Sequence, residues 1–130
     1  MKLSQILKDV KTLNTYEDVE ISGLTDDSRK LVPGCLFVCI EGARFDGHTV
    51  AEWALENGAV SVLTQKDLGL DRQIVVEDTR EAYSLAAGAF FGNPARQLKL
   101  VGITGTNGKT TTSFILREVL EKAGYKTGLI

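Results

Sequence analysis

At 130 residues, 43% of them hydrophobic, the chain is long enough to form a domain with its own core. The 15 Lys and Arg residues against 17 Asp and Glu residues give a formal net charge of -2 without a basic stripe, which argues against nucleic acid as a partner. The N-terminal residues are interrupted by charges and no apolar run could span a bilayer, so we expect a cytoplasmic protein with no membrane partner.

The first third of the chain predicts one short helix and two strands. Apolar residues on one face predict a helix at residues 3–10, an extended piece follows at 19–24, and the apolar run 35–40 predicts a buried strand. Alternation places Cys35 and Cys39 on one face of that strand, too far apart for an easy disulfide. We interpret both cysteines as small buried hydrophobic residues.

Strands and helices alternate in the next part of the chain. A helix is expected at 47–57 and strands at 59–63 and 74–76. A second helix, capped by Asp78 or Thr79, is expected to run to about residue 91. This order predicts an α/β architecture in which at least part of the sheet is parallel.

The stretch 93–97 is the best candidate for a domain boundary, because it combines a helix stop with polar residues before a new strand. We therefore place a first domain at residues 1–95 and the start of a second at 96–130.

A strand at 100–103, the loop TGTNGKTT and a helix at 113–123 predict a phosphate-binding loop. Glycines let the backbone approach phosphate oxygens, and the N–H groups at a helix start attract negative charge. Lys109 adds a positive charge for the terminal phosphates of ATP, and the Thr110 hydroxyl is the candidate Mg²⁺ ligand. A tight turn without a ligand would not need Lys followed by Thr. The residues predicted to bind ATP are Gly105, Thr106, Asn107, Gly108, Lys109, Thr110 and Thr111.

This loop departs from the general phosphate-loop pattern, which has Gly where Ile103 stands, and in this form, TGTNGKT, it resembles the Mur ligase family. The segment DSRKLVPGCLFVCIEGARFDGH is similar to the part of these enzymes that holds the uridine nucleotide substrate. The stretch FFGNPARQLKLVGITGTNGKTTT is most similar to the MurE type. The resemblance implies a small N-terminal α/β domain that binds the UDP-substrate. It is followed by the first strand, loop, helix and next strand, at 127–130, of a truncated ATP-binding domain.

The resemblance also implies a substrate site in the first domain. By position, Ser28, with Asp26 nearby, would contact the uridine part, and Ala43, Arg44 and Phe45 would line the same site. From the residues alone, the turn that holds Asp26 and Ser28 is more often a solvated turn bonded to its own backbone. The Arg44 guanidinium suits a diphosphate, whereas Phe45 could equally be a core residue.

His48 is the only histidine and could be read as an acid or base. The sequence identifies no partner for it, so packing at a helix start is the preferred interpretation.

The activity that the resemblance implies is ATP-dependent amide ligation in peptidoglycan precursor synthesis, and hence in cell wall formation. The γ-phosphate would pass to the D-glutamyl carboxylate of UDP-MurNAc-L-Ala-D-Glu, and an amino acid, diaminopimelate or lysine, would displace it from the acyl phosphate. Lys109 would disperse the developing charge and is the candidate catalytic residue. The remaining metal ligands and the amine site are expected beyond residue 130, so the chain alone is expected to be inactive. Two alternatives stay open: a MurF-type ligase that adds a dipeptide, and a non-catalytic nucleotide-binding module.

Overall fold

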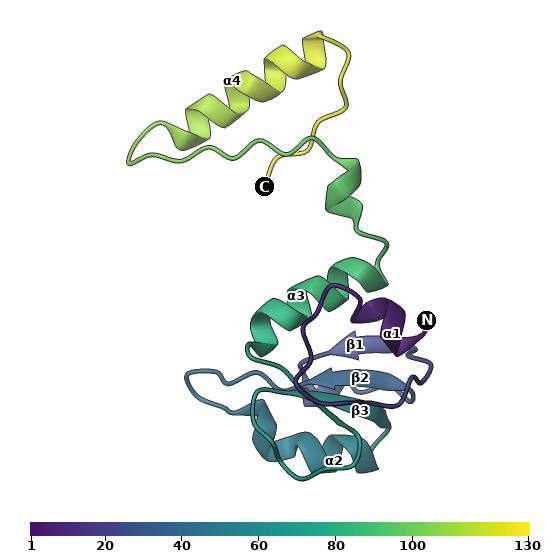
Figure 1. Ribbon diagram of the computed structural model, residues 1–130. Helices are drawn as coiled ribbons and strands as arrows, with labels where there is room; N and C mark the ends of the chain where they lie inside the picture. The colour runs from purple at the N-terminus through teal and green to yellow at the C-terminus, as the bar shows by residue number, and fades with distance from the viewer. The chain divides into compact units, whose positions relative to one another are not determined.

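The computed structural model describes residues 1–130, which form two compact units, Met1–Gln97 and Leu98–Ile130 (Figure 1). The division follows the short 3-10 helix η3 (Pro94–Gln97). The segment 93–97, which the sequence marks as a boundary, lies directly before it. No helix in either unit combines the length and apolar character that crossing a membrane requires.

The first unit contains a sheet of four parallel strands, as the alternation of strands and helices predicts (Figure 1). The strands lie in chain order, so each is connected to its neighbour by a crossover. Their bounds are β1 (Gly23–Thr25), β2 (Cys35–Val38), β3 (Ala59–Thr64) and β4 (Gln73–Val75).

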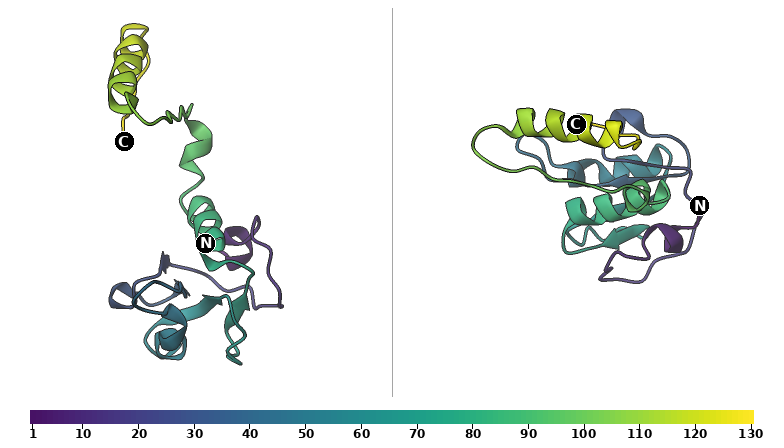
Figure 2. Two further views of the ribbon diagram at one scale, coloured as in Figure 1. Left: turned by 90° about the vertical axis from the view of Figure 1, so that its left-hand side faces the viewer. Right: turned by 90° about the horizontal axis from the view of Figure 1, so that it is seen from above.

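Helices cover both faces of this sheet. The first layer holds α1 (Leu3–Ile6) and α3 (Thr79–Phe90), which lie side by side (Figure 1, Figure 2). The other face carries α2 (Ala51–Glu56). A central strand with both faces covered is apolar throughout, which is why β2 is a continuous buried run.

Alternation along β2 divides the core into two clusters. Leu36 and Val38 pack with residues of α1 and α3, whereas Cys35, Phe37 and Cys39 pack with residues of α2. Both cysteines are buried and unpaired, which confirms their interpretation as core residues. Burial raises the pKa of the Cys39 thiol to about 12.

The ends of the helices follow local chemistry. The Asp78 carboxylate caps α3 by accepting the N–H groups of Arg80 and Glu81. After the C-cap residue Phe91 the chain leaves the helix at Gly92 and Asn93, which both have positive φ angles. The helix expected at 3–10 is shorter than predicted. It ends at Ile6, after which the chain turns and the Val10 N–H donates to the Leu7 carbonyl at 2.9 Å.

A segment from the N-terminal region covers the outer edge of β4. The Leu13 N–H donates to the Val75 carbonyl at 2.8 Å. The Asn14 side chain accepts the Val75 N–H at 2.7 Å and donates to the Gln73 carbonyl at 3.0 Å. The backbone groups along this edge of the sheet are therefore satisfied within the chain.

The second unit holds one helix, α4 (Lys109–Lys122), with no buried residue. The strands expected at 100–103 and 127–130 are not formed, so this part of the prediction is wrong for the structure described. A strand exists only as part of a ladder, and no other segment of the chain pairs with either stretch. Leu100 and Val101 in the first of these stretches stay exposed, at 73% and 65%.

Candidate functional site

The loops that carry the candidate substrate residues follow the carboxyl ends of the strands. Asp26 and Ser28 follow β1, and the loop 41–47 follows β2. Gln65 and Lys66 follow β3, and Arg80 lies in the first turn of the helix after β4. Because all strands are parallel, these segments meet at one edge, which is where open α/β sheets bind ligands.

In the turn after β1, some polar side chains form hydrogen bonds within the chain and others are left free. Asp27, which the sequence did not single out, caps the 3-10 helix η1 (Ser28–Lys30) and accepts the Nε–H of Arg29 at 2.9 Å. The side-chain bond from Arg29, followed by its backbone N–H, lowers the pKa of Asp27 to about 2. The side chains of Asp26 and Ser28 make no hydrogen bond within the chain, so the solvated-turn interpretation describes Asp27 better than these two residues.

The loop after β2 is a closed structure with an exposed tip. Glu41 and Asp46 form an antiparallel bridge, and the Gly42 N–H donates to the Phe45 carbonyl at 2.9 Å. Ala43 and Arg44 at the tip are exposed. The Phe45 side chain is 55% exposed, so the alternative that it is a core residue is wrong.

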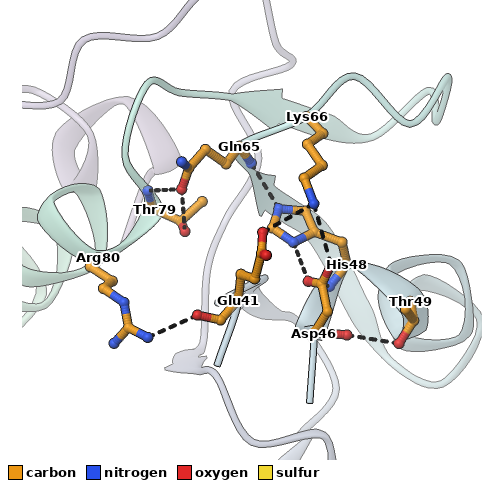
Figure 3. Close-up of polar contacts among 8 residues, drawn as sticks. All are labelled: Glu41, Asp46, His48, Thr49, Gln65, Lys66, Thr79 and Arg80. Atoms are coloured by element: carbon orange, nitrogen blue, oxygen red, sulfur yellow. Dashed lines mark hydrogen bonds and ion pairs between the residues drawn. The ribbon is translucent and has the colours of Figure 1, made fainter. Parts of the chain in front are cut away.

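His48 has two hydrogen-bonding partners, neither of which the sequence identified (Figure 3). Its Nε2 accepts the Gln65 N–H at 3.0 Å, and its Nδ1 lies against the Asp46 carboxylate. Because Nε2 accepts a main-chain N–H, Nδ1 carries the proton and donates to Asp46. With a side chain only 4% exposed, His48 joins the loop after β2 to the end of β3. Gln65 lies 17 residues away in the sequence, which is why sequence spacing did not reveal it.

Lys66 and Arg80 also contact the loop after β2, which the sequence did not indicate (Figure 3). The Lys66 Nζ lies 3.1 Å from the Glu41 carboxylate and 3.4 Å from that of Asp46. The Arg80 guanidinium donates to the Glu41 carbonyl at 2.9 Å. The available signal was position, since both residues lie just after strand ends of a predicted parallel sheet.

The predicted phosphate loop leads directly into α4. Gly105 and Gly108 have φ angles of 153° and 74°, in the region that favours glycine. Gly108 precedes the first helical residue, and no side chain caps the helix. The N–H groups of Lys109, Thr110 and Thr111 therefore have no acceptor in the chain, and the first turn holds no acidic residue. Such a helix start suits an anion.

The side chains of this loop are available to a ligand. The Lys109 ammonium donates to the Gly105 carbonyl at 2.6 Å, which folds it back over the loop. The Thr110 hydroxyl is exposed and makes no hydrogen bond. No group of three or more His, Cys, Asp or Glu residues in the chain could hold a metal ion by itself. The residues present thus fit a phosphate chain, with Thr110 as the one candidate ligand for an accompanying Mg²⁺.

Known proteins similar to this chain are enzymes of one family. A UDP-N-acetylmuramoyl-L-alanyl-D-glutamate–2,6-diaminopimelate ligase from Bacillus licheniformis is 42% identical over 134 residues. Ligases of the same name from Listeria monocytogenes and Clostridium botulinum are 43% and 44% identical. The alignments cover 100% of this chain but only 28%, 27% and 28% of the relatives, so the chain spans little more than a quarter of their length.

Solved structures give the same picture. MurF from Acinetobacter baumannii has a TM-score of 0.65 and 28% identity, over 92% of this chain and 27% of that protein. A UDP-N-acetylmuramoyl-L-alanyl-D-glutamate–2,6-diaminopimelate ligase has a TM-score of 0.63 and 26% identity, over 95% and 26% of the two chains. MurF from Thermotoga maritima, solved in complex with ADP, has a TM-score of 0.53 and 33% identity, over 76% and 23%.

The family model described as Mur ligase family, catalytic domain, matches residues 20–90. The match contains all four strands and the loops at their carboxyl ends, and it ends before the phosphate loop. Since the matched residues make up more than half of its 130 residues, the chain belongs to the Mur ligase family.

Proposed function

We propose that the chain is part of an ATP-dependent ligase of the MurE type, which adds diaminopimelate to UDP-MurNAc-L-Ala-D-Glu. The curated relatives that match the chain along its whole length, at 42–44% identity, are ligases named for this reaction. Their names favour diaminopimelate over lysine. The observation that carries the proposal in the structure is the uncapped start of α4, with its free N–H groups and adjacent Lys109.

The first unit is proposed to bind the uridine nucleotide. Asp26 and Ser28 offer unpaired polar groups beside the carboxyl end of β1, and Ala43, Arg44 and Phe45 are exposed on the loop after β2. The guanidinium of Arg44 can form paired hydrogen bonds with phosphate oxygens. Both segments lie at the edge of the sheet where a ligand of this size is expected.

The second unit is proposed to bind the phosphates of ATP through Gly105–Thr111. The Lys109 ammonium donates to the Gly105 carbonyl, and we expect it to exchange this acceptor for phosphate oxygens when ATP binds. The Thr110 hydroxyl would hold Mg²⁺, which offsets phosphate charge when bound. The similar MurF from Thermotoga maritima, solved with ADP, supports a nucleotide here.

The proposed reaction forms an amide from the D-glutamyl carboxylate and the amine of diaminopimelate, with ATP converted to ADP and phosphate. Lys109 and the loop N–H groups would orient the phosphate chain and stabilise its charge. Because the chain spans 28% of its Bacillus licheniformis relative, we expect the 130 residues alone to release no ADP in the presence of both substrates.

Calorimetric titration with ATP and Mg²⁺ tests the phosphate loop. Lys109→Ala should weaken ATP binding by about 10- to 100-fold, the range expected when a charge-assisted hydrogen bond is lost. Lys122→Ala is the matched control, because it removes an exposed lysine at the other end of the same helix. Equal ATP affinity of the unchanged chain and the Lys109→Ala variant would refute the assignment of this loop.

A MurF-type ligase is the second candidate, since solved MurF structures match the chain with 28% identity. Titration with two nucleotides separates the two types. Tighter binding of UDP-MurNAc-L-Ala-D-Glu than of the corresponding tripeptide nucleotide supports the MurE type, and the reverse order supports MurF. A chain that binds ATP but neither nucleotide would instead support the non-catalytic module.

A further inference from the structure

The loop Glu41–Asp46 is short, and its tip is exposed, yet residues from elsewhere in the chain hold its base. The Glu41–Asp46 bridge and the bond from the Gly42 N–H to the Phe45 carbonyl close the loop on itself. Beyond these, contacts reach the loop from the end of β3 and from the first turn of α3 (Figure 3).

Lys66 and Arg80 make these outer contacts in different ways. Lys66 lies between the carboxylates of Glu41 and Asp46, so one ammonium group joins both sides of the loop base. It also offsets two negative charges that would otherwise repel an anionic ligand at the tip. Arg80 instead holds the main chain, because its guanidinium donates to the Glu41 carbonyl.

These two residues contribute little to the packed core. Lys66 is 54% exposed, and Arg80 is exposed as well. Exposed ion pairs of this kind add little to the stability of a fold. The buried His48 is different, since it satisfies the Gln65 N–H inside the protein and its replacement would disturb folding. The contacts of Lys66 and Arg80 therefore act on the loop more than on the domain.

We propose that Lys66 and Arg80 are positioning residues, which hold the loop Glu41–Asp46 in the conformation that presents Arg44 to the diphosphate of the uridine nucleotide. This inference rests on the proposed function of the first unit. A loop that is ordered before the ligand arrives loses less freedom on binding, so affinity depends on the residues that order it. The nucleotide need not contact either residue.

The test measures affinity, stability and loop order in the whole chain. Lys66→Met and Arg80→Met, alone and together, are titrated with UDP-MurNAc-L-Ala-D-Glu by calorimetry. The double variant should raise Kd about tenfold or more through loss of preorganisation, while Tm and the Kd for ATP stay unchanged. The single variant Lys66→Arg, which keeps the positive charge, should retain most of the affinity for UDP-MurNAc-L-Ala-D-Glu. In NMR relaxation, the amides of residues 42–45 should become more mobile in the double variant.

Two matched controls remove similar contacts elsewhere. Arg72→Met removes a guanidinium that donates to the Leu55 carbonyl at 3.4 Å, and Lys122→Met removes an ion pair with Glu118. Both should leave nucleotide affinity and loop mobility unchanged.

The outcomes separate this inference from the function on which it rests. An unchanged Kd for UDP-MurNAc-L-Ala-D-Glu in the double variant would overturn the positioning role alone. A raised Kd that is accompanied by a lowered Tm would do the same, because the loss of affinity would then follow from destabilisation of the fold. Unchanged mobility of residues 42–45 would do the same. Absence of uridine nucleotide binding by the unaltered chain would overturn the proposed function together with this inference.

Discussion

At the scale of single residues, the Asp46 carboxylate makes the most polar contacts in the loop after β2. It accepts the main-chain N–H of His48 at 3.0 Å, faces the His48 ring and lies 3.4 Å from the Lys66 ammonium. The backbone N–H of His48, followed by the ring, lowers the pKa of Asp46 to about 2. The folded protein thus favours the charged form of this carboxylate.

This pKa predicts a specific dependence of stability on pH. Because the pKa of Asp46 is about 2 in the folded chain and 3.8 ordinarily, its charged form stabilises the fold above pH 3.8. The stabilisation is lost as the pH falls through about 2. The Tm of the unchanged chain should therefore exceed that of Asp46→Asn at neutral pH, and the difference should shrink toward pH 2. Thermal unfolding followed by circular dichroism at several pH values measures it. A difference that stays constant over this range would contradict the prediction.

At the residue scale, the sequence pointed to the segments that hold the candidate residues but not to every contact within them. The turn after β1 was recognised, yet its cap is Asp27 rather than Asp26 or Ser28. The partner of His48 is a main-chain N–H at the end of β3, and no side-chain pattern encodes such a contact. Roles that depend on neighbours in the sheet become visible only when the strands are assembled.

At the scale of elements, the start of α3 offers a direct test of local sequence chemistry. The Asp78 carboxylate accepts the N–H of Arg80 at 2.7 Å and that of Glu81 at 3.1 Å. Asp78→Ala removes both bonds and should lower the free energy of unfolding by about 0.5–2 kcal/mol, the usual effect of losing such a cap. Urea denaturation measures the change.

Asp78→Asn is the matched control, because asparagine is an equally good capping residue and should retain most of the stability. If asparagine destabilised α3 as much as alanine does, the charge of Asp78 rather than its capping bonds would be responsible.

The elements were predicted well where local pattern and packing agree. The strands β2 and β3 are mostly apolar runs between turns, and the end of α3 is marked by Gly92 and Asn93. The stretches 100–103 and 127–130 are equally apolar, but their pairing depends on segments that the pattern cannot supply. The end of α1 at Ile6 was missed because the apolar spacing continues to Val10.

At the scale of the whole molecule, the buried core belongs to the first unit. Every buried residue of both hydrophobic clusters lies within Met1–Gln97, and α4 has none. Hydrogen bonds of a helix that has no buried residue open easily. The two units should therefore differ in local stability.

Hydrogen–deuterium exchange of the whole chain, followed by mass spectrometry, measures this difference. Amides of β2 and β3 should exchange on the order of 1000-fold more slowly than those of α4, because their opening requires unfolding of the core. The effect of ATP and Mg²⁺ serves as an internal reference, since a ligand at Gly105–Thr111 should slow exchange at the start of α4. Equal protection of α4 and β2 without ligand would show that α4 is packed.

For the candidate site as a whole, the sequence indicated individual residues and loops, but not how they are arranged in space. The pattern of strand, glycine-rich loop and helix indicated the phosphate loop, and the resemblance to the family added Ser28 and Arg44. The parallel order of the strands, which the sequence suggested only in part, is what brings Lys66 and Arg80 to the same edge.

The Asn14 side chain, which binds along β4, also bears on how molecules of this protein meet one another. An open sheet invites strands from other chains, and such intermolecular pairing is a common route to aggregates. Leu13 and Asn14 occupy the free hydrogen-bonding groups along β4, and the other edge strand, β1, is only three residues long. The sheet therefore has few free backbone groups with which a strand of another molecule could pair, which disfavours aggregation through its edges.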